Sequence, residues 1–270
     1  MNTTTSDRPL TLGQQFAIQR RIIWALILRE TVTRFGREGL GMLWIIGEPA
    51  MFIIGVMIIF SVAADGVGYV GGVTVAEYLA VSYPTLLFWR NGTGRVIKAL
   101  EVNRALLHHR QIRPIDIIYA RIILEFSSGI AVFFVLFPLC IIIGICHAPD
   151  NLFVMCIGYL LIIWFSFAFV MIMAALSDMS ETIEKISHII LYLMLPFSGV
   201  FLPTYAIPEP YRTYLLYFPL VDAVGYFHSG YFGGRMPTYY NLEYTFFLLS
   251  VLTVFGYTLT YVAIGKIKRF

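Results

Sequence analysis

Four ionisable side chains lie inside or at the edges of long apolar segments: Glu48, Asp116, Arg121 and Glu125. A charge at membrane depth is costly, and it usually faces a partner or a water-filled path. Arg121 and Glu125 are four residues apart, so they can pair on one face of a helix. Asp116 follows Pro114, where a carboxylate complements the positive end of a helix dipole. Structural pairing accounts for these three, whereas Glu48 has no sequence-local partner and is the stronger candidate for a functional charge.

Histidines, cysteines and glycine-rich loops form no pattern typical of an enzyme or a metal site. The histidines are His108, His109, His147, His188 and His228. The adjacent pair His108 and His109 points in two directions on a helix, whereas a metal clamp needs i, i+4 spacing. The cysteines Cys140, Cys146 and Cys156 show no ligand spacing, so we expect them to be packing residues. No GxxxxGK[ST] phosphate loop occurs, so if the protein uses ATP, another chain must bind it.

The composition indicates a membrane protein. Of 270 residues, 59% are hydrophobic and 13% are charged, whereas ordinary globular domains carry about 25% charged residues. The segment Met1 to Leu12 is polar and no small-residue cleavage site follows the first apolar run, so we expect no cleavable signal peptide. The basic residues cluster beside apolar runs, as topology determinants do, which argues against a nucleic-acid partner.

The apolar runs predict an all-α integral membrane protein with six transmembrane helices. The spans are expected at about 44–64, 75–96, 117–145, 152–176, 186–204 and 243–264, between an N-terminal part (1–43) and a short tail (265–270). Residues 14–34 are too charged to span and predict an amphipathic helix at the membrane interface. There we expect Arg20, Arg21 and Arg29 to face headgroups, and Trp24 and the isoleucines to face lipid. An ordinary amphipathic helix packed on protein is the alternative.

The basic residues orient these spans. If both termini are cytoplasmic, the inner segments hold most of the 19 basic residues, and only Arg212 and Arg235 lie outside. This is a strong positive-inside bias. The second span is weak, because Pro84 interrupts the short stretch between Glu77 and Arg90. Removing it would place six basic residues outside, so we retain it.

Two segments between spans are distinctive. The stretch 95–114 predicts a basic amphipathic helix, which either lies against anionic headgroups or docks into a groove of a cytoplasmic partner. The stretch 203–242 is rich in prolines and aromatics and is too apolar for a solvated loop, so we expect two short or re-entrant helices outside the fifth span. Its aromatics suit an interfacial belt, or alternatively a surface on which sugars stack.

The motif RFGREGLGMLWIIGEP resembles the approach to the first span in ABC transporter permeases of the type-two polysaccharide exporter family. The stretch LLHHRQIRPIDIIYARIILE resembles the segment before the third span of the capsular polysaccharide (group two capsule) members. The stretch PFSGVFLPTYAIPEPYRTYLLYFPLVDAVGYFHSGYF is similar to their outer re-entrant region. The chain departs from these relatives at Phe218, Asp222, Gly225 and His228.

This resemblance implies a homodimeric permease whose two copies form the pathway above a separate ATPase dimer, which binds ATP and Mg. The implied cargo is a lipid-linked capsular polysaccharide crossing the inner membrane, with a periplasmic co-polymerase or adaptor and an outer-membrane partner. The implied contacts with the ATPase are Leu100, Arg104, Leu106, Leu107, His109 and Arg110. The motif at the first span implies a gate formed by Arg34, Arg37, Gly41, Trp44, Glu48 and Pro49. The aromatics expected along a polymer path are Tyr83, Trp89, Tyr192 and Phe197, with helix packing as the alternative for each.

Three other functions remain open from the sequence. An O-antigen or other undecaprenyl-linked glycan is the alternative cargo, because its exporters share this architecture. An integral-membrane glycolipid enzyme would need a clustered acid and base, which the sequence does not show. A secondary transporter would normally show inverted repeats, and none is apparent.

Overall fold

The computed structural model describes residues 11–35, 43–108 and 112–267, and within these ranges the chain is built from helices without a strand. The long helices are α1 (Leu12–Phe35), α2 (Trp44–Ala63), α3 (Val75–Val96), α5 (Pro114–Ile142), α6 (Leu152–Met179) and α10 (Leu242–Ile267). The shorter ones are α4 (Ala99–Val102), α7 (Glu181–Leu193), α8 (Tyr211–Leu216) and α9 (Pro219–Phe232). Single 3₁₀ turns lie at η2 (Val70–Gly72), η3 (Arg104–His108), η4 (Pro196–Ser198), η5 (Thr204–Ala206) and η6 (Gly233–Arg235). The prediction of an all-helical protein is confirmed.

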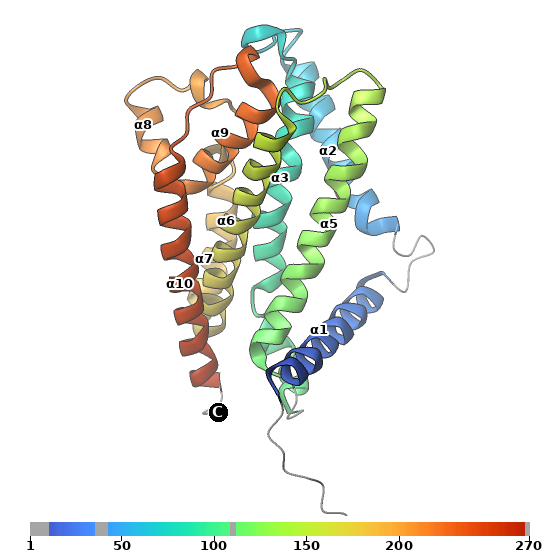
Figure 1. Ribbon diagram of the computed structural model, residues 1–270, viewed down its shortest axis with the longest axis vertical. Helices are drawn as coiled ribbons and strands as arrows, with labels where there is room; N and C mark the ends of the chain where they lie inside the picture. The colour runs from blue at the N-terminus through green and yellow to red at the C-terminus, as the bar shows by residue number, and fades with distance from the viewer. Residues whose placement is uncertain (1–10, 36–42, 109–111, 268–270) are drawn as a thin grey trace, which may run out of the picture.

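Helix α6 occupies the centre of the bundle. It packs against α3, α9 and α10, while α3 also contacts α5 and α2. The C-terminal end of α10 lies at the same end of the molecule as α1, and α8 and α9 lie at the opposite end (Figure 1). Below, these are called the α1 end and the α8 end.

Four described helices are long and apolar enough to cross a bilayer: Ile46–Ala63, Pro114–Ile142, Leu152–Met179 and Leu242–Gly265. Helix α3 also runs at the predicted place, but it carries Glu77, Arg90 and Arg95 and is less apolar. Six spans therefore remain a prediction, of which four meet the requirement of length and hydropathy.

The fifth predicted span is displaced. We expected a helix over 186–204, whereas α7 covers Glu181–Leu193. Proline at position 196 removes a backbone donor and disfavours helical geometry just before it, and Gly199 follows with φ of 72°. The sequence stays apolar beyond the end of the helix at Leu193. Hydropathy alone therefore predicts a span that begins and ends C-terminal to the observed helix.

Helix α1 packs on protein along one face. Leu26 is buried, and Ile22, Ile23 and Ile27 are half-buried against the core, whereas Trp24 is 60% exposed. Ile22, Ile23 and Ile27 therefore pack partly on the bundle, as in the alternative of a helix packed on protein, whereas Ile18 is 40% exposed. The bounds of α1 agree with the helix predicted over 14–34.

Candidate functional site

Helix α1 is fixed to the bundle by polar contacts as well as by its isoleucines. Gln19 Nε2 donates to Asp116 Oδ1 at 2.7 Å, and an Arg29 guanidinium nitrogen donates to Asn103 Oδ1 at 3.2 Å. Arg121 Nε lies 3.4 Å from Glu30 Oε1. Arg121, which the sequence paired with Glu125, thus connects α5 to α1. These contacts join the N-terminal helix to both α5 and the segment before it.

That segment, α4 with η3, follows a sharp turn after α3. Lys98 adopts φ of 54°, a left-handed conformation that ends α3 and redirects the chain. Leu100 is then 1% exposed and packs in the core, whereas Val102 is 71% exposed. Asn103 Nδ2 donates to the Ala99 carbonyl at 2.9 Å, which closes the turn. The segment therefore has one face anchored in the bundle and one apolar side chain turned outward.

An ion-pair network connects this segment to α7. Lys98 Nζ lies 3.0 Å from Glu184 Oε2 and 3.2 Å from Glu101 Oε2. The hydrogen bond to Glu184, and then that to Glu101, raises the pKa of Lys98 above its ordinary value. The lysine therefore stays charged near neutral pH and couples the position of α4 to the start of α7.

A cavity of about 290 Å³ lies between α2, α3 and α5, and Glu48 lines it. Its other lining residues are Pro49, Phe52, Leu87, Arg90, Asn91, Arg95, Leu124, Glu125 and Ser128. Arg95 Nε lies 3.9 Å from Glu125 Oε1, and the Arg90 guanidinium lies 5.6 Å from the centre of the Tyr192 ring. The sequence could not identify this environment, because Arg90 and Arg95 line the same cavity as Glu48 from another helix. Two carboxylates and two guanidinium groups facing one space can bind hydroxyls and anions.

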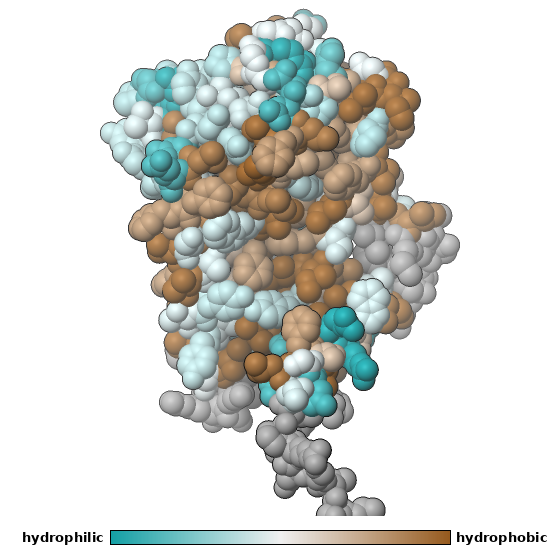
Figure 2. Space-filling model, viewed as in Figure 1, coloured by the Kyte–Doolittle hydropathy of each residue, from teal (hydrophilic) through white to brown (hydrophobic). Residues whose placement is uncertain are grey.

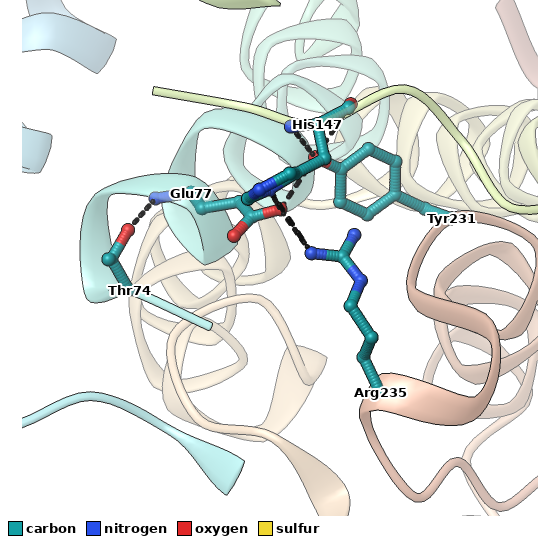
Figure 3. Close-up of polar contacts among 5 residues, drawn as sticks. All are labelled: Thr74, Glu77, His147, Tyr231 and Arg235. Atoms are coloured by element: carbon teal, nitrogen blue, oxygen red, sulfur yellow. Dashed lines mark hydrogen bonds and ion pairs between the residues drawn. The ribbon is translucent and has the colours of Figure 1, made fainter. Parts of the chain in front are cut away.

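A second polar cluster lies at the α8 end (Figure 3). Glu77 is 1% exposed, and its Oε1 accepts hydrogen bonds from the Tyr231 hydroxyl at 2.9 Å and from Arg235 at 3.0 Å. His147 Nδ1 also lies 3.0 Å from this oxygen. Thr74 Oγ1 caps α3 by accepting from the Glu77 backbone N–H at 3.0 Å. The cluster fastens the start of α3 to α9, η6 and the turn before α6.

The family follows from comparison with known proteins. The profile of the ABC-2 type transporter family matches residues 21–232. The chain belongs to this family. It is 32% identical to the capsule polysaccharide export inner-membrane protein CtrC of Neisseria meningitidis serogroup B, over 90% of this chain and 91% of CtrC. It is 29% identical to the export protein BexB of Haemophilus influenzae, over 87% and 88% of the two chains. It is 28% identical to the polysialic acid transport protein KpsM of Escherichia coli, over 89% and 92%.

The other residues singled out in this ABC-2 transporter chain differ in how far they are buried. Tyr83 and Trp89 are buried in the core, where packing accounts for them, whereas Tyr192 and Phe197 are 63% and 59% exposed. Leu106 and Leu107 are half-buried against the core. Arg37, Gly41, His109 and Arg110 lie outside the described residues, as do the side chains of Arg34 and Arg104. Arg20 and Arg21 are exposed on α1, and Trp44 and Pro49 are half-buried at the start of α2.

The sequence missed the cluster around Glu77. In the sequence Glu77 only bounds the short stretch of the weak second span, and His147, Tyr231 and Arg235 belong to three other segments. A buried carboxylate in an apolar helix was the available signal, because such a group requires hydrogen-bond donors. Its partners depend on how α9 folds back over α3, which no local pattern reveals.

The four residues that depart from the family pattern, Phe218, Asp222, Gly225 and His228, each make specific contacts in the fold. Asp222 Oδ2 accepts from the Asn241 backbone N–H and the Thr245 hydroxyl, each at 3.1 Å. His228 is buried, and its Nε2 lies 2.7 Å from Ser82 Oγ. A Cβ on Gly225 would approach the Tyr239 carbonyl oxygen to 2.5 Å, so only glycine fits there. Phe218 packs edge-to-face on Phe165. These contacts explain the four residues as parts of the fold at the α8 end.

Proposed function

We propose that this chain is the transmembrane subunit of an ATP-driven exporter that moves a lipid-linked capsular polysaccharide across a bacterial inner membrane. The observation that carries the proposal is its similarity, over about nine-tenths of both chains, to capsule polysaccharide export inner-membrane proteins. Two copies would form the pathway, and a separate ATPase dimer would bind ATP and Mg. A periplasmic adaptor or co-polymerase and an outer-membrane partner would complete the route.

Coupling to the ATPase is assigned to α4 and η3. This segment lies at the α1 end, and Val102 is 71% exposed on it, as an anchor for a groove of a partner protein would be. Leu100 is buried in the core, so its role is to hold the segment to the bundle. A force on Val102 would reach α7 through the pairing of Lys98 with Glu184, and α1 through Asn103 and Arg29.

Cargo contact is assigned to the cavity around Glu48. Its charged groups can bind sugar hydroxyls and carboxylates, because charge-assisted hydrogen bonds are strong where water is partly excluded. Tyr192 lies against Arg90 with most of its side chain exposed, and its ring offers a face on which a sugar can stack. Phe197, also exposed, follows it along the chain.

Co-purification with the ATPase tests this proposal. Val102→Asp places a charge at the outward position of α4, and Val67→Asp is the matched control, because Val67 is also 71% exposed but lies in the turn after α2. We expect the wild type and Val67→Asp to bring down the ATPase and to support export of capsule in a deletion strain. The Val102→Asp variant should be present in the membrane at normal abundance but should no longer co-purify with the ATPase.

Two outcomes would contradict the proposal. If wild-type subunit binds no ATPase and restores no surface glycan, the exporter function is wrong. If Val102→Asp retains the ATPase, the coupling segment has been misassigned while the exporter function stands. The composition of the glycan that accumulates in the deletion strain distinguishes a capsular polysaccharide from an O-antigen as the cargo.

A further inference from the structure

A groove in two parts runs along the face formed by α1, α5 and α6. The first part, about 650 Å³, lies between α1 and α5 and is lined by Arg20, Arg21 and Trp24 among others. The second part, about 460 Å³, lies between α5 and α6. Tyr119 and Ile123 line both parts, so the two parts lie next to each other along α5. Each part is within the usual range of small-molecule binding sites.

The part next to α1 carries two arginine side chains. Arg20 and Arg21 are exposed, and neither has an ion-pair or hydrogen-bond partner among the residues that the structure describes. Their neighbour Gln19 is occupied, because its side-chain amide donates to Asp116. Trp24 is 60% exposed beside them, and tryptophan is enriched at the level of lipid headgroups.

The part between α5 and α6 accepts an apolar chain. Ile123 is 43% exposed and Leu160 is 63% exposed along it. Two of its polar atoms are already used: the Tyr119 hydroxyl donates to Tyr257 at 2.9 Å, and Trp164 Nε1 donates to Thr253 at 2.9 Å. The groove is thus basic at one end and apolar along the rest. Figure 2 shows hydrophobic residues over the middle of this face and hydrophilic residues at the α1 end.

We propose that this groove holds one anionic phospholipid from the leaflet at the α1 end. Its phosphate lies against Arg20 and Arg21, and one acyl chain passes Ile123 and runs between α5 and α6. An amphiphile matches the groove because charge and apolar surface are segregated along it in the order headgroup, then chain. This inference goes beyond the proposed export function, since it concerns a resident lipid and not the cargo.

The proposed lipid lies next to a contact that attaches α1 to the bundle. It would fill the space between α1 and α5 beside the Gln19–Asp116 hydrogen bond. The same helix α1 reaches the coupling segment through Arg29 and Asn103. Membranes without anionic lipid should therefore weaken the attachment of α1 to the bundle.

Native mass spectrometry of the purified full-length subunit tests the proposal, with phosphatidylglycerol and phosphatidylcholine as competing probes. We expect wild type to retain one phosphatidylglycerol in preference to phosphatidylcholine. An arginine near an anionic surface typically contributes about a fivefold factor in binding, so the pair Arg20→Gln and Arg21→Gln should reduce the preference more than tenfold. The control pair Arg113→Gln and Lys185→Gln removes the same charge from exposed sites outside the groove.

A second variant tests the acyl-chain part. Ser127 is exposed and lines this part, so Ser127→Trp should block it and reduce retention of both lipids while the protein stays folded. Equal retention of phosphatidylglycerol by all variants would overturn the proposal. So would finding glycan-linked lipid, and no phospholipid, in the groove of protein purified from its host. Neither result depends on whether the ATPase binds.

Discussion

At the scale of single residues, the charges of this chain are placed by partners that lie far away in sequence. Glu48 and Glu77 are both acids near the start of apolar helices, yet their surroundings differ. Glu77 is enclosed and receives hydrogen bonds from Tyr231 and Arg235. Glu48 is exposed and lines a cavity with two arginines. Glu77 therefore serves as a structural anchor, whereas Glu48 is accessible to a ligand.

Replacement of Glu48 by glutamine should impair export and leave folding intact. The change keeps the shape of the side chain and removes the charge that faces the cavity. A lost charge-assisted contact of roughly 1.4 kcal/mol corresponds to about a tenfold lower export rate. The measurement is surface glycan per unit of membrane-inserted subunit. Glu243→Gln, an exposed glutamate outside this cavity, is the control and should export normally. Normal export by Glu48→Gln would remove Glu48 from the pathway.

Replacement of Glu77 by glutamine should instead destabilise the subunit. A neutral amide cannot maintain all three contacts that the carboxylate makes with Tyr231, His147 and Arg235. Buried polar groups that lose their partners lower stability. We expect a loss of about 2 kcal/mol in unfolding free energy. Thermal unfolding in detergent measures it, with Glu209→Gln as control, because the Glu209 side chain is 50% exposed in its ion pair with Arg212. An unchanged midpoint for Glu77→Gln would mean that the cluster contributes nothing to stability.

At the scale of elements, the sequence predicted helices where hydropathy and charge agree, and it failed where packing decides. The weak second span was retained because of the basic residues after it, and α3 forms there. The end of α7 was misplaced because the apolar run continues beyond Pro196. Periodicity predicts an apolar face on α1 without showing what covers it, and three of its isoleucines pack partly on the bundle. The cavity and the Glu77 cluster were beyond prediction, since each joins side chains from three or more segments.

Close packing of α6 on α9 depends on glycine. A Cβ at Gly158 would lie 2.4 Å from the Phe227 Cα, and one at Gly230 would lie 2.2 Å from the Met155 backbone nitrogen. Gly158→Val must therefore push α9 away from α6, at a cost of about 3 kcal/mol. Gly55→Val is the matched control, because nothing lies within 4 Å of its added Cβ. Thermal unfolding of both variants checks this, and equal midpoints would show that α9 can shift freely.

At the scale of the whole molecule, the Lys98 ion-pair network and the Glu77 cluster lie at opposite ends. The segment of α4 and η3 lies with α1 at one end, and the Glu77 cluster lies with α8 and α9 at the other (Figure 1). Central helices α3, α5 and α6 connect them. A movement imposed at one end must therefore pass along whole helices, whose ends are held by ion pairs and hydrogen bonds.

Cysteine labelling should place these ends on opposite sides of the membrane. In a cysteine-free background, Val102→Cys is expected to react with an impermeant maleimide only in inverted membrane vesicles, and Val67→Cys only in spheroplasts. Both positions have the same side chain and the same exposure, so any difference reports sidedness and not reactivity. Labelling of both from one side would contradict the topology derived from the basic residues.

Helix α2 contacts the rest of the chain along a narrow edge. Ile53 and Met57 are buried on it, whereas Met51, Ile54 and Ile58 are 55%, 44% and 59% exposed. Only 11% of the segment Ile46–Ala63 is buried. The residues that keep this helix in the fold are therefore separate from those that meet its surroundings. Substitutions at Met51, Ile54 and Ile58 can therefore change the surface that α2 presents without removing the buried side chains that hold the helix in the fold.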